Sequence, residues 1–179
     1  ILEEADQAYD HLKSFIRREN IDCDFVQCGR FMGAHSSRSY DKIAFKMVEY
    51  NKSPNPDFEM IPITEQHKIV NSTYYKGGMF NHNAGTIHPA KYHDELVRVA
   101  VSSGVKLVSD TLVQKIVSTK KEKKIFTSSG MITAEHVMIG TGGYTDRLSP
   151  YHRKRIIPMS STLIATQKIG KKRVEEILP

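Results

Sequence analysis

The first third of the chain alternates amphipathic helical patterns with short strand-like runs. Over residues 3–19, apolar side chains recur at intervals of three and four, acidic residues come first, and Arg17 and Arg18 come last. This spacing predicts a helix whose charged ends suit the helix dipole. Its expected buried stripe is Ala5, Ala8, Tyr9, Leu12, Phe15 and Ile16. Residues 25–31 then predict a strand that ends among glycines.

A second and a third helical pattern follow. Ser36 or Ser37 is suited to cap a helix whose expected buried stripe is Ile43, Ala44, Met47 and Val48. The run 53–57, Ser-Pro-Asn-Pro-Asp, predicts its end, and a short helix is expected after Thr64. Pro89 opens the third helix, with the expected stripe Leu96, Val97, Ala100 and Val101, and Gly104 supplies a left-handed stop.

The pattern changes to strands after Gly104. Residues 105–109 predict one strand, and residues 112–133 predict an antiparallel meander of three strands turned by Lys-Lys-Glu-Lys and Ser-Gly. The apolar run 136–141 is typical of a covered parallel strand. We therefore expect an α/β fold in which strands 105–109 and 136–141 share one sheet and the meander connects them. The side chains expected to be buried together are Leu96, Val97, Ala100, Val101, Val137 and Ile139, so Val137→Asp should destabilise by several kcal/mol.

Composition places the chain among ordinary globular proteins. Of its 179 residues, 39% are apolar and 26% are charged, and no apolar run approaches the roughly 20 residues that span a bilayer, so no membrane partner is expected. Cys23 and Cys28 form neither a disulfide framework nor a zinc pattern, which favours a reducing, cytoplasmic location. The sequence opens at Ile1 without Met or a signal peptide, which predicts an internal fragment of a longer protein.

Charge and histidine content raise two further possibilities. The net charge is +6, but the basic runs lie far apart and have no interleaved aromatic residues for stacking on bases. We interpret them as solvated surface and expect no nucleic-acid partner. His82, His88 and His93 lack carboxylates at ligand spacing, so no metal site is expected. The motifs of serine hydrolases and P-loop nucleotide hydrolases are absent from the sequence.

The segment Gly140-Thr141-Gly142-Gly143 carries the strongest chemical signal. It follows the apolar run 136–141, and ligands bind at the carboxyl ends of strands in open α/β sheets. Glycines without side chains would let a phosphate-bearing cofactor approach the backbone closely. The alternative is an ordinary turn after a strand.

In a wider context, this segment resembles part of a known family. Gly85-Thr86-Ile87-His88-Pro89 and Gly140-Thr141-Gly142-Gly143-Tyr144-Thr145 are similar to motifs of the flavin-dependent oxidoreductases that include glycine, D-amino-acid and sarcosine oxidases (the DAO family). The γ-glutamylputrescine-oxidoreductase-like branch is the most similar. Other matching stretches follow in the family's order: 29–31, 77–80, 104–107, 111–116, 148–150, 155–158 and 164–167.

The resemblance implies a fold, a cofactor and a reaction. The fold would be a partial FAD-binding sheet of the two-dinucleotide-binding type, with part of a substrate domain, and the cofactor FAD in the intact parent protein. Val113 would contact the adenine through its backbone, and Thr141, Gly142 and Gly143 would line the dinucleotide groove. The reaction would oxidise a C–N bond of a small-molecule amine or amino acid to an imine. Val113 could equally be a core strand residue, while His88-Pro89 is expected to open a helix and Tyr144 to pack.

The sequence also departs from the family. It contains no Gly-x-Gly-x-x-Gly after a strand, the element that binds the pyrophosphate, and its residues 140–143 differ from the usual Ala-Thr-Asn/Gly-Gly/Ala. We therefore expect a fragment, inactive alone, whose partners are the N- and C-terminal parts of the same protein. The expected division is 25–104 as a mixed FAD-domain and substrate-domain segment, 105–145 as FAD-domain strands and meander, and 146–179 as the start of a second substrate-domain segment. The alternative is a truncated or split folded module without a cofactor, and no catalytic residue can be assigned.

Overall fold

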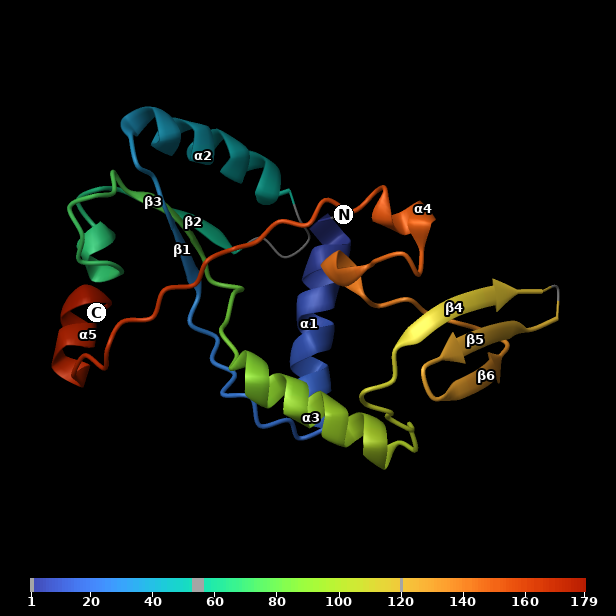
Figure 1. Cartoon of the computed structure of the whole chain (residues 1–179). Helices are drawn as coiled ribbons and strands as arrows, with labels where there is room; N and C mark the ends of the chain where they lie inside the picture. The colour runs from blue at the N-terminus through green and yellow to red at the C-terminus, as the bar shows by residue number, and fades with distance from the viewer. Residues whose placement is uncertain (1, 53–56, 120) are drawn as a thin grey trace. The chain divides into compact units, whose positions relative to one another are not determined.

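The chain divides into two compact units. The computed structural model describes residues 2–52, 57–119 and 121–179 (Figure 1). Unit 1 consists of Ile1–Val105 and Thr166–Pro179, and unit 2 consists of Lys106–Ala165. Residues 53–56 of the predicted break at 53–57, and Lys120 of the predicted turn in the meander, lie outside the described residues. Within the described residues, no helix is long and apolar enough to cross a membrane.

The core of unit 1 lies between its first and third long helices. Helix α1 (Leu2–Arg18) leads to a loop in which Ile21 and Cys23 are buried beside Ile16. Helix α3 (Pro89–Ser102) packs on this cluster and crosses near the C-terminal end of α1, as Figure 1 shows. Residues far apart in the sequence thus form one apolar core.

The three predicted long helices form, but the buried stripe of each differs in part from expectation. In α1, Tyr9, Leu12, Phe15 and Ile16 are at least partly buried as predicted, whereas Ala8 is exposed and the side chain of Ala5 lies outside the described ones. In α3, the packed side chains are Tyr92, Leu96 and Val99, at the i, i+4, i+7 spacing of one helix face. Val97 and Val101 are 37% and 53% exposed, so the expected stripe was wrong at these positions.

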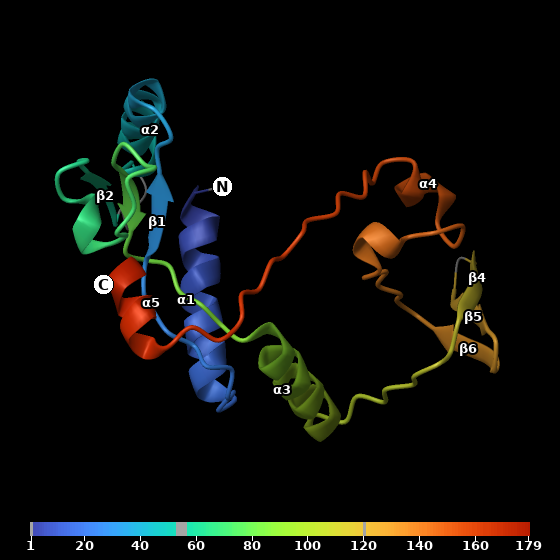
Figure 2. The same ribbon diagram turned by 60° about the vertical axis from the view of Figure 1, so that its left-hand side comes forward.

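A small antiparallel sheet forms the rest of unit 1. Strand β3 (Gly78–Asn81) lies between β1 (Arg30–Gly33) and β2 (Phe58–Ile61) (Figure 2). Helix α2 (Ser37–Tyr50) packs against β2 and β3 and is capped by Ser36, whose hydroxyl accepts a hydrogen bond from Ser39 N at 3.1 Å. The predicted capping is therefore confirmed.

Smaller elements complete unit 1. The strand expected at 25–31 begins only at Arg30, although Val26 bridges to Thr86. Ile43, Ala44 and Met47 of α2 are half-buried as expected, but Val48 is exposed. The short helix expected after Thr64 is the 3₁₀ turn η1 (Gln66–Lys68), and α5 (Lys171–Ile177) is held to this unit by hydrogen bonds from Asn71 to the carbonyls of Glu176 and Ile177.

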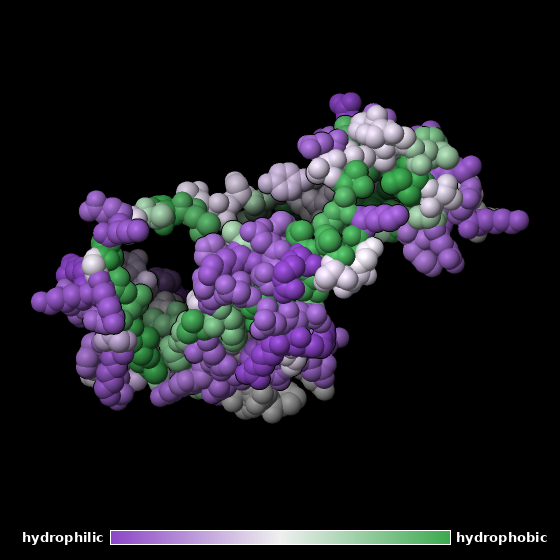
Figure 3. All heavy atoms as spheres, turned by 90° about the horizontal axis from the view of Figure 1, so that it is seen from below, coloured by the Kyte–Doolittle hydropathy of each residue, from purple (hydrophilic) through white to green (hydrophobic). Residues whose placement is uncertain are grey.

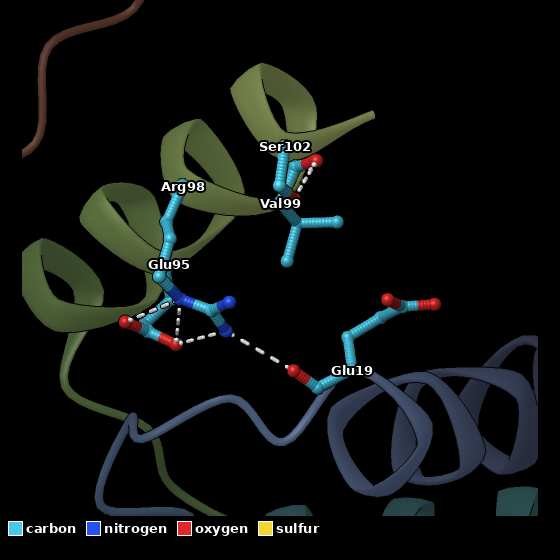
Figure 4. Close-up of polar contacts among 5 residues, drawn as sticks. All are labelled: Glu19, Glu95, Arg98, Val99 and Ser102. Carbon is cyan, nitrogen blue, oxygen red and sulfur yellow. Dashed lines mark hydrogen bonds and ion pairs between the residues drawn. The ribbon is translucent and has the colours of Figure 1, made fainter. Parts of the chain in front are cut away.

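A fork of hydrogen bonds joins α3 to the end of α1. The Arg98 guanidinium donates to the Glu95 carboxylate, at 2.7 Å in the shortest contact, and to the Glu19 carbonyl at 3.0 Å (Figure 4). Hydrogen bonding from Arg98 lowers the pKa of the Glu95 carboxyl, and the same pairing raises the pKa of Arg98. The fork therefore fixes α3 against the C-terminal turn of α1.

The lowered pKa predicts how Arg98→Ala changes acid stability. A carboxyl whose pKa is depressed in the folded state stabilises the fold above its unfolded pKa, and this contribution disappears as the pH falls through the folded pKa. We expect Arg98→Ala to raise the Glu95 pKa toward its ordinary value, measured by carboxyl NMR titration. The stability difference from wild type should shrink in acid. Lys68→Ala, which removes the separate pair with Glu65, should leave the Glu95 titration unchanged.

Unit 2 is built on the predicted meander. Strands β4 (Val113–Ser118), β5 (Lys123–Thr127) and β6 (Gly130–Ala134) pair antiparallel in that order. Ile125 on the central strand is buried and lies opposite Ile116 on one side and Ile132 on the other. At the β4–β5 hairpin, Thr119 N and Oγ1 both donate to the Glu122 carbonyl. The expected three-stranded meander is confirmed.

The two strands expected on either side of the meander do not form. Residues 105–109 and 136–141 belong to no helix or strand, which corrects the expected parallel pair. A parallel strand needs backbone partners from neighbouring strands, and the described residues supply none for either segment. Leu107, Val108 and Met138 are consequently exposed, Met138 by 95%. Apolar side chains reach the surface on the face drawn in Figure 3.

The buried group that was expected to include these strands is likewise absent. Val137 and Ile139 of unit 2 are 38% and 39% exposed, and Val97 and Val101 of unit 1 are exposed as well, so these four side chains are not buried as expected. An aspartate at 137 would therefore keep access to water. The expected burial of Val137 was wrong, and with it goes the reason to expect a large destabilisation from Val137→Asp.

Candidate functional site

A pocket of about 530 Å³ lies within unit 2, at the start of the meander. This volume falls in the range of about 300–1,000 Å³ that is usual for small-molecule sites. Two segments form the walls, one before and within β4 and one after the meander. The lining residues are Thr111, Leu112, Val113, Gln114, Thr141, Tyr144, Asp146, Arg147 and Leu148.

The first wall is positioned by the pairing of β4 with β5. Leu112 N donates to Ser128 Oγ at 3.2 Å, and Ser128 N donates to the Leu112 carbonyl at 2.9 Å. The register then shifts between Val113 and Lys115, so Gln114 is an extra residue of a bulge. Among the described strands, β4 is an edge strand whose one neighbour is β5. The backbone groups on its other edge are therefore free to bind a ligand.

The second wall is a tight turn closed by two threonines. The Thr145 hydroxyl donates to the Gly142 carbonyl at 2.8 Å and lies 2.7 Å from the Thr141 hydroxyl, while Tyr144 N donates to the Thr141 carbonyl at 3.0 Å. These bonds form the 3₁₀ turn η2 (Gly142–Tyr144). Gly142 adopts φ +52°, a left-handed conformation that glycine accepts readily.

Gly143 has a different environment. A Cβ built on Gly143 would meet no atom within 4 Å, and its φ is not in the left-handed region. Neither the local conformation nor packing within the described chain therefore requires a glycine at 143. A ligand that approaches the backbone closely is one physical reason for a glycine at such a position.

The structure brings two of the four predicted cofactor residues together. Val113 and Thr141 both line the pocket, one from each of its two segments. Gly143 instead lines two neighbouring cavities of about 520 and 680 Å³. Gly142 lines none of these three spaces and only shapes the turn. Tyr144 borders all three and is 95% exposed, so its expected packing role was wrong.

Charged residues of the pocket were missed by sequence reasoning. Asp146 lines the pocket and pairs with Arg153, their Oδ1 and Nη1 atoms lying 3.6 Å apart. Arg147 also lines it and makes no hydrogen bond, ion pair or ring contact with the described part of the chain. The available signal was position, because Asp146 and Arg147 directly follow the glycine-containing turn.

The arrangement suits binding more than proton transfer. Shifted pKa values occur at Glu95 and Arg98, and at Lys91, where hydrogen bonding to Asp24 raises the pKa. All three belong to unit 1 and none lines the pocket. Among the described residues, no three His, Cys, Asp or Glu side chains are grouped to hold a metal ion. The pocket presents backbone edges, two threonine hydroxyls, an exposed aromatic ring and one unpaired guanidinium.

Comparison with known proteins covers the whole chain. The family model described as FAD dependent oxidoreductase (DAO) matches residues 1–179. The probable oxidoreductase OrdL of Haemophilus influenzae is 22% identical over 176 residues, covering 96% of this chain and 41% of the relative. Gamma-glutamylputrescine oxidoreductase of Escherichia coli is 22% identical over 169 residues, covering 94% and 39%. The chain thus spans about two fifths of the length of these relatives.

Solved structures share the fold. Glycine oxidase from Geobacillus kaustophilus superposes with a TM-score of 0.73 at 20% identity, covering 79% of this chain and 40% of that one. L-proline dehydrogenase from P. horikoshii superposes with a TM-score of 0.63 at 17% identity, covering 75% and 36%. The fold expected from the sequence resemblance is therefore confirmed, apart from the two flanking strands.

Proposed function

Because the chain belongs to the FAD dependent oxidoreductase family, we propose that it is part of an enzyme that oxidises the C–N bond of a small amine or amino acid to an imine. The observation that carries the proposal is the family match over residues 1–179 together with a pocket that Val113 and Thr141 both line. When bound, FAD supplies the redox chemistry by accepting a hydride equivalent from the carbon that bears the amine.

The residues of unit 2 fit the adenosine end of the cofactor. The edge of β4 that is unpaired among the described strands offers backbone N–H donors and C=O acceptors at Val113. These groups can form hydrogen bonds with the donor and acceptor atoms along the edge of the adenine ring. Thr141 supplies a hydroxyl from the other segment that lines the pocket. Gly142 shapes the turn, and Gly143 leaves its backbone uncovered for the rest of the dinucleotide. These four residues are our proposed cofactor-binding set.

The proposal also assigns each part of the chain to a domain of the intact enzyme. Residues 105–145 would contribute strands and the meander to the FAD-binding domain. Residues 25–104 would join FAD-domain and substrate-domain segments, and residues 146–179 would begin a second substrate-domain segment. The coverage of relatives supports further segments of the same protein as partners. We also propose a cytoplasmic location, supported by the free thiols Cys23 and Cys28.

The proposed substrate class rests on what similar proteins are named for. One relative is a gamma-glutamylputrescine oxidoreductase, and two structural neighbours are a glycine oxidase and an L-proline dehydrogenase. All three names indicate small molecules with an amine nitrogen. Nucleic acid is not part of the proposal, because the pocket is small and the basic runs lack stacking residues.

One observation favours an alternative. The sequence contains no Gly-x-Gly-x-x-Gly phosphate loop, which is compatible with a folded module that works without a cofactor. The two proposals differ at the pocket, because a module without a cofactor has no reason to bind adenosine there.

An NMR titration of residues 1–179 with adenosine tests the site. We expect shifts of the amide signals of residues 111–114 and 141–147. The dissociation constant should lie in the millimolar range, because a few weak contacts to one nucleoside give a binding free energy of only about 4 kcal/mol. Cytidine, with a smaller base and a different edge, is the control and should shift these amides less. Equal responses to both nucleosides, or shifts confined to unit 1, would refute the proposed adenosine pocket.

A further inference from the structure

Arg147 is the one basic residue of the segment 147–155 that lines the pocket of Val113 and Thr141. The segment also contains His152, Arg153, Lys154 and Arg155. His152 Nδ1 is 2.7 Å from Ser149 Oγ, and Arg153 pairs with Asp146. The Arg155 guanidinium lies 3.7 Å from the ring centroid of Tyr151 and donates to the Tyr151 carbonyl at 2.8 Å.

The backbone holds Arg147 at this position. Ser149 N donates to the Asp146 carbonyl at 3.2 Å, which makes 146–149 a turn with an aspartate at its first position, where turns favour it. Helix α4 (Pro150–Arg153) begins immediately after, with proline in its first turn. Arg147 is therefore fixed in the chain between the glycine-containing turn and a helix, and its side chain has no partner in the described part of the protein.

An unpaired guanidinium beside a pocket has a definite chemical preference. Its planar fork binds phosphate or carboxylate with two parallel hydrogen bonds. The pocket already offers a free strand edge, hydroxyls and an aromatic ring, which suit a nucleoside better than a carboxylic acid. Asp146 in the same wall carries the opposite charge, but its pairing with Arg153 compensates that charge locally.

We propose that Arg147 is a specificity-determining residue that binds the phosphate attached to the adenosine, so that the pocket selects adenine nucleotides over adenosine. This inference rests on the proposed FAD function and adds a phosphate contact that lies outside any Gly-x-Gly-x-x-Gly loop. It predicts that residues 1–179 bind ADP more tightly than adenosine. It also predicts that the difference decreases at high salt, because the ion pair is exposed.

The test compares adenosine, AMP and ADP on wild type and on Arg147→Ala by NMR titration. We expect wild type to bind ADP roughly 3- to 10-fold more tightly than adenosine, as a screened charge-assisted contact allows. Arg147→Ala should reduce this preference to about 1 while leaving adenosine affinity unchanged. Arg147→Lys, which keeps the charge without the fork, should retain part of the preference.

Lys154→Ala is the matched control, since it removes the same charge from a residue that lines none of the three cavities. An equal loss of ADP preference in Lys154→Ala would show attraction by the net charge of +6 alone and would overturn the role of Arg147. If wild type binds adenosine and ADP with equal affinity, the role of Arg147 is also overturned, while the proposed adenosine pocket remains intact. Adenosine that fails to bind at all would refute the pocket itself and, with it, this inference.

Discussion

Residues 1–179, purified without other segments of a flavoprotein, are expected to be colourless and free of FAD. Pyrophosphate binding in dinucleotide folds uses aligned backbone amides at a helix N-terminus, which a glycine-rich first turn makes accessible. The sequence contains no Gly-x-Gly-x-x-Gly to provide them. The contacts proposed at Val113, Thr141 and Arg147 would remain, but they reach only the adenosine end of the cofactor.

The size of the loss follows from the missing hydrogen bonds. Each hydrogen bond to a charged group contributes roughly 1.5–3 kcal/mol, so three lost bonds to the diphosphate cost about 4.5–9 kcal/mol. At about 1.4 kcal/mol per factor of ten, affinity for FAD falls by roughly three to six orders of magnitude. A cofactor bound this weakly does not survive purification.

The measurement is the visible absorbance of the purified chain, followed by flavin fluorescence of an acid extract. An intact member of the same family whose sequence includes a strand, a Gly-x-Gly-x-x-Gly turn and a helix is the control, and it should be yellow. Stoichiometric flavin on residues 1–179 would show that the phosphate site lies within this chain and that its assignment to another segment is wrong.

Local signals in the sequence predicted the helices and the meander well. The start of α2 at its Ser36 cap and the end of α3 before Gly104, which has φ +88°, depend on residues within one or two turns. The hairpins of β4, β5 and β6 connect neighbours in sequence and are closed by their own turn residues. Such elements need few distant contacts, which is why the pattern of side chains is sufficient to predict them.

The failed predictions depend on distant partners. Segments 105–109 and 136–141 have the apolar character of covered strands, but strand structure also requires hydrogen bonds from neighbouring strands. The α3 stripe was misplaced for a related reason. Tyr92 and Val99 are partly buried because they pack against the cluster of Ile16, Ile21 and Cys23, and periodicity within α3 alone does not specify that contact.

The candidate site was predicted only in part. Val113 came from the family resemblance alone, because a backbone contact leaves no side-chain signature, whereas the segment with Thr141 was also indicated by its glycines after an apolar run. Arg147 was missed because a single arginine among several basic residues is usually solvated surface. Arg147 differs from Arg153 and Arg155 because it lines the pocket while they pair with Asp146 and Tyr151. Only the three-dimensional structure shows this difference.

The largest effect on stability is expected from Ile125→Asp, which should unfold the meander. Ile125 is 8% exposed on the central strand, between Ile116 and Ile132 on its two neighbours. An aspartate there would be buried without a partner, at a cost of about 3 kcal/mol or more. A sheet of three strands with one small apolar face has little stability to lose, so β4, β5 and β6 should unfold together.

Ile132→Asp is the matched control, because it makes the same substitution in the same cross-strand row at a position that is 54% exposed. Its carboxylate stays in water, so the expected cost is about 1 kcal/mol or less.

Amide hydrogen exchange should show lost protection over 113–134 in Ile125→Asp and near wild-type protection in Ile132→Asp. Amides of α1 and α3, whose core is Ile16, Ile21 and Cys23, serve as an internal reference and should stay protected in both variants. Equal loss of protection in the two variants would mean that burial of Ile125 does not stabilise the meander. Loss of protection in α1 as well would mean that unit 1 depends on the meander for its own stability.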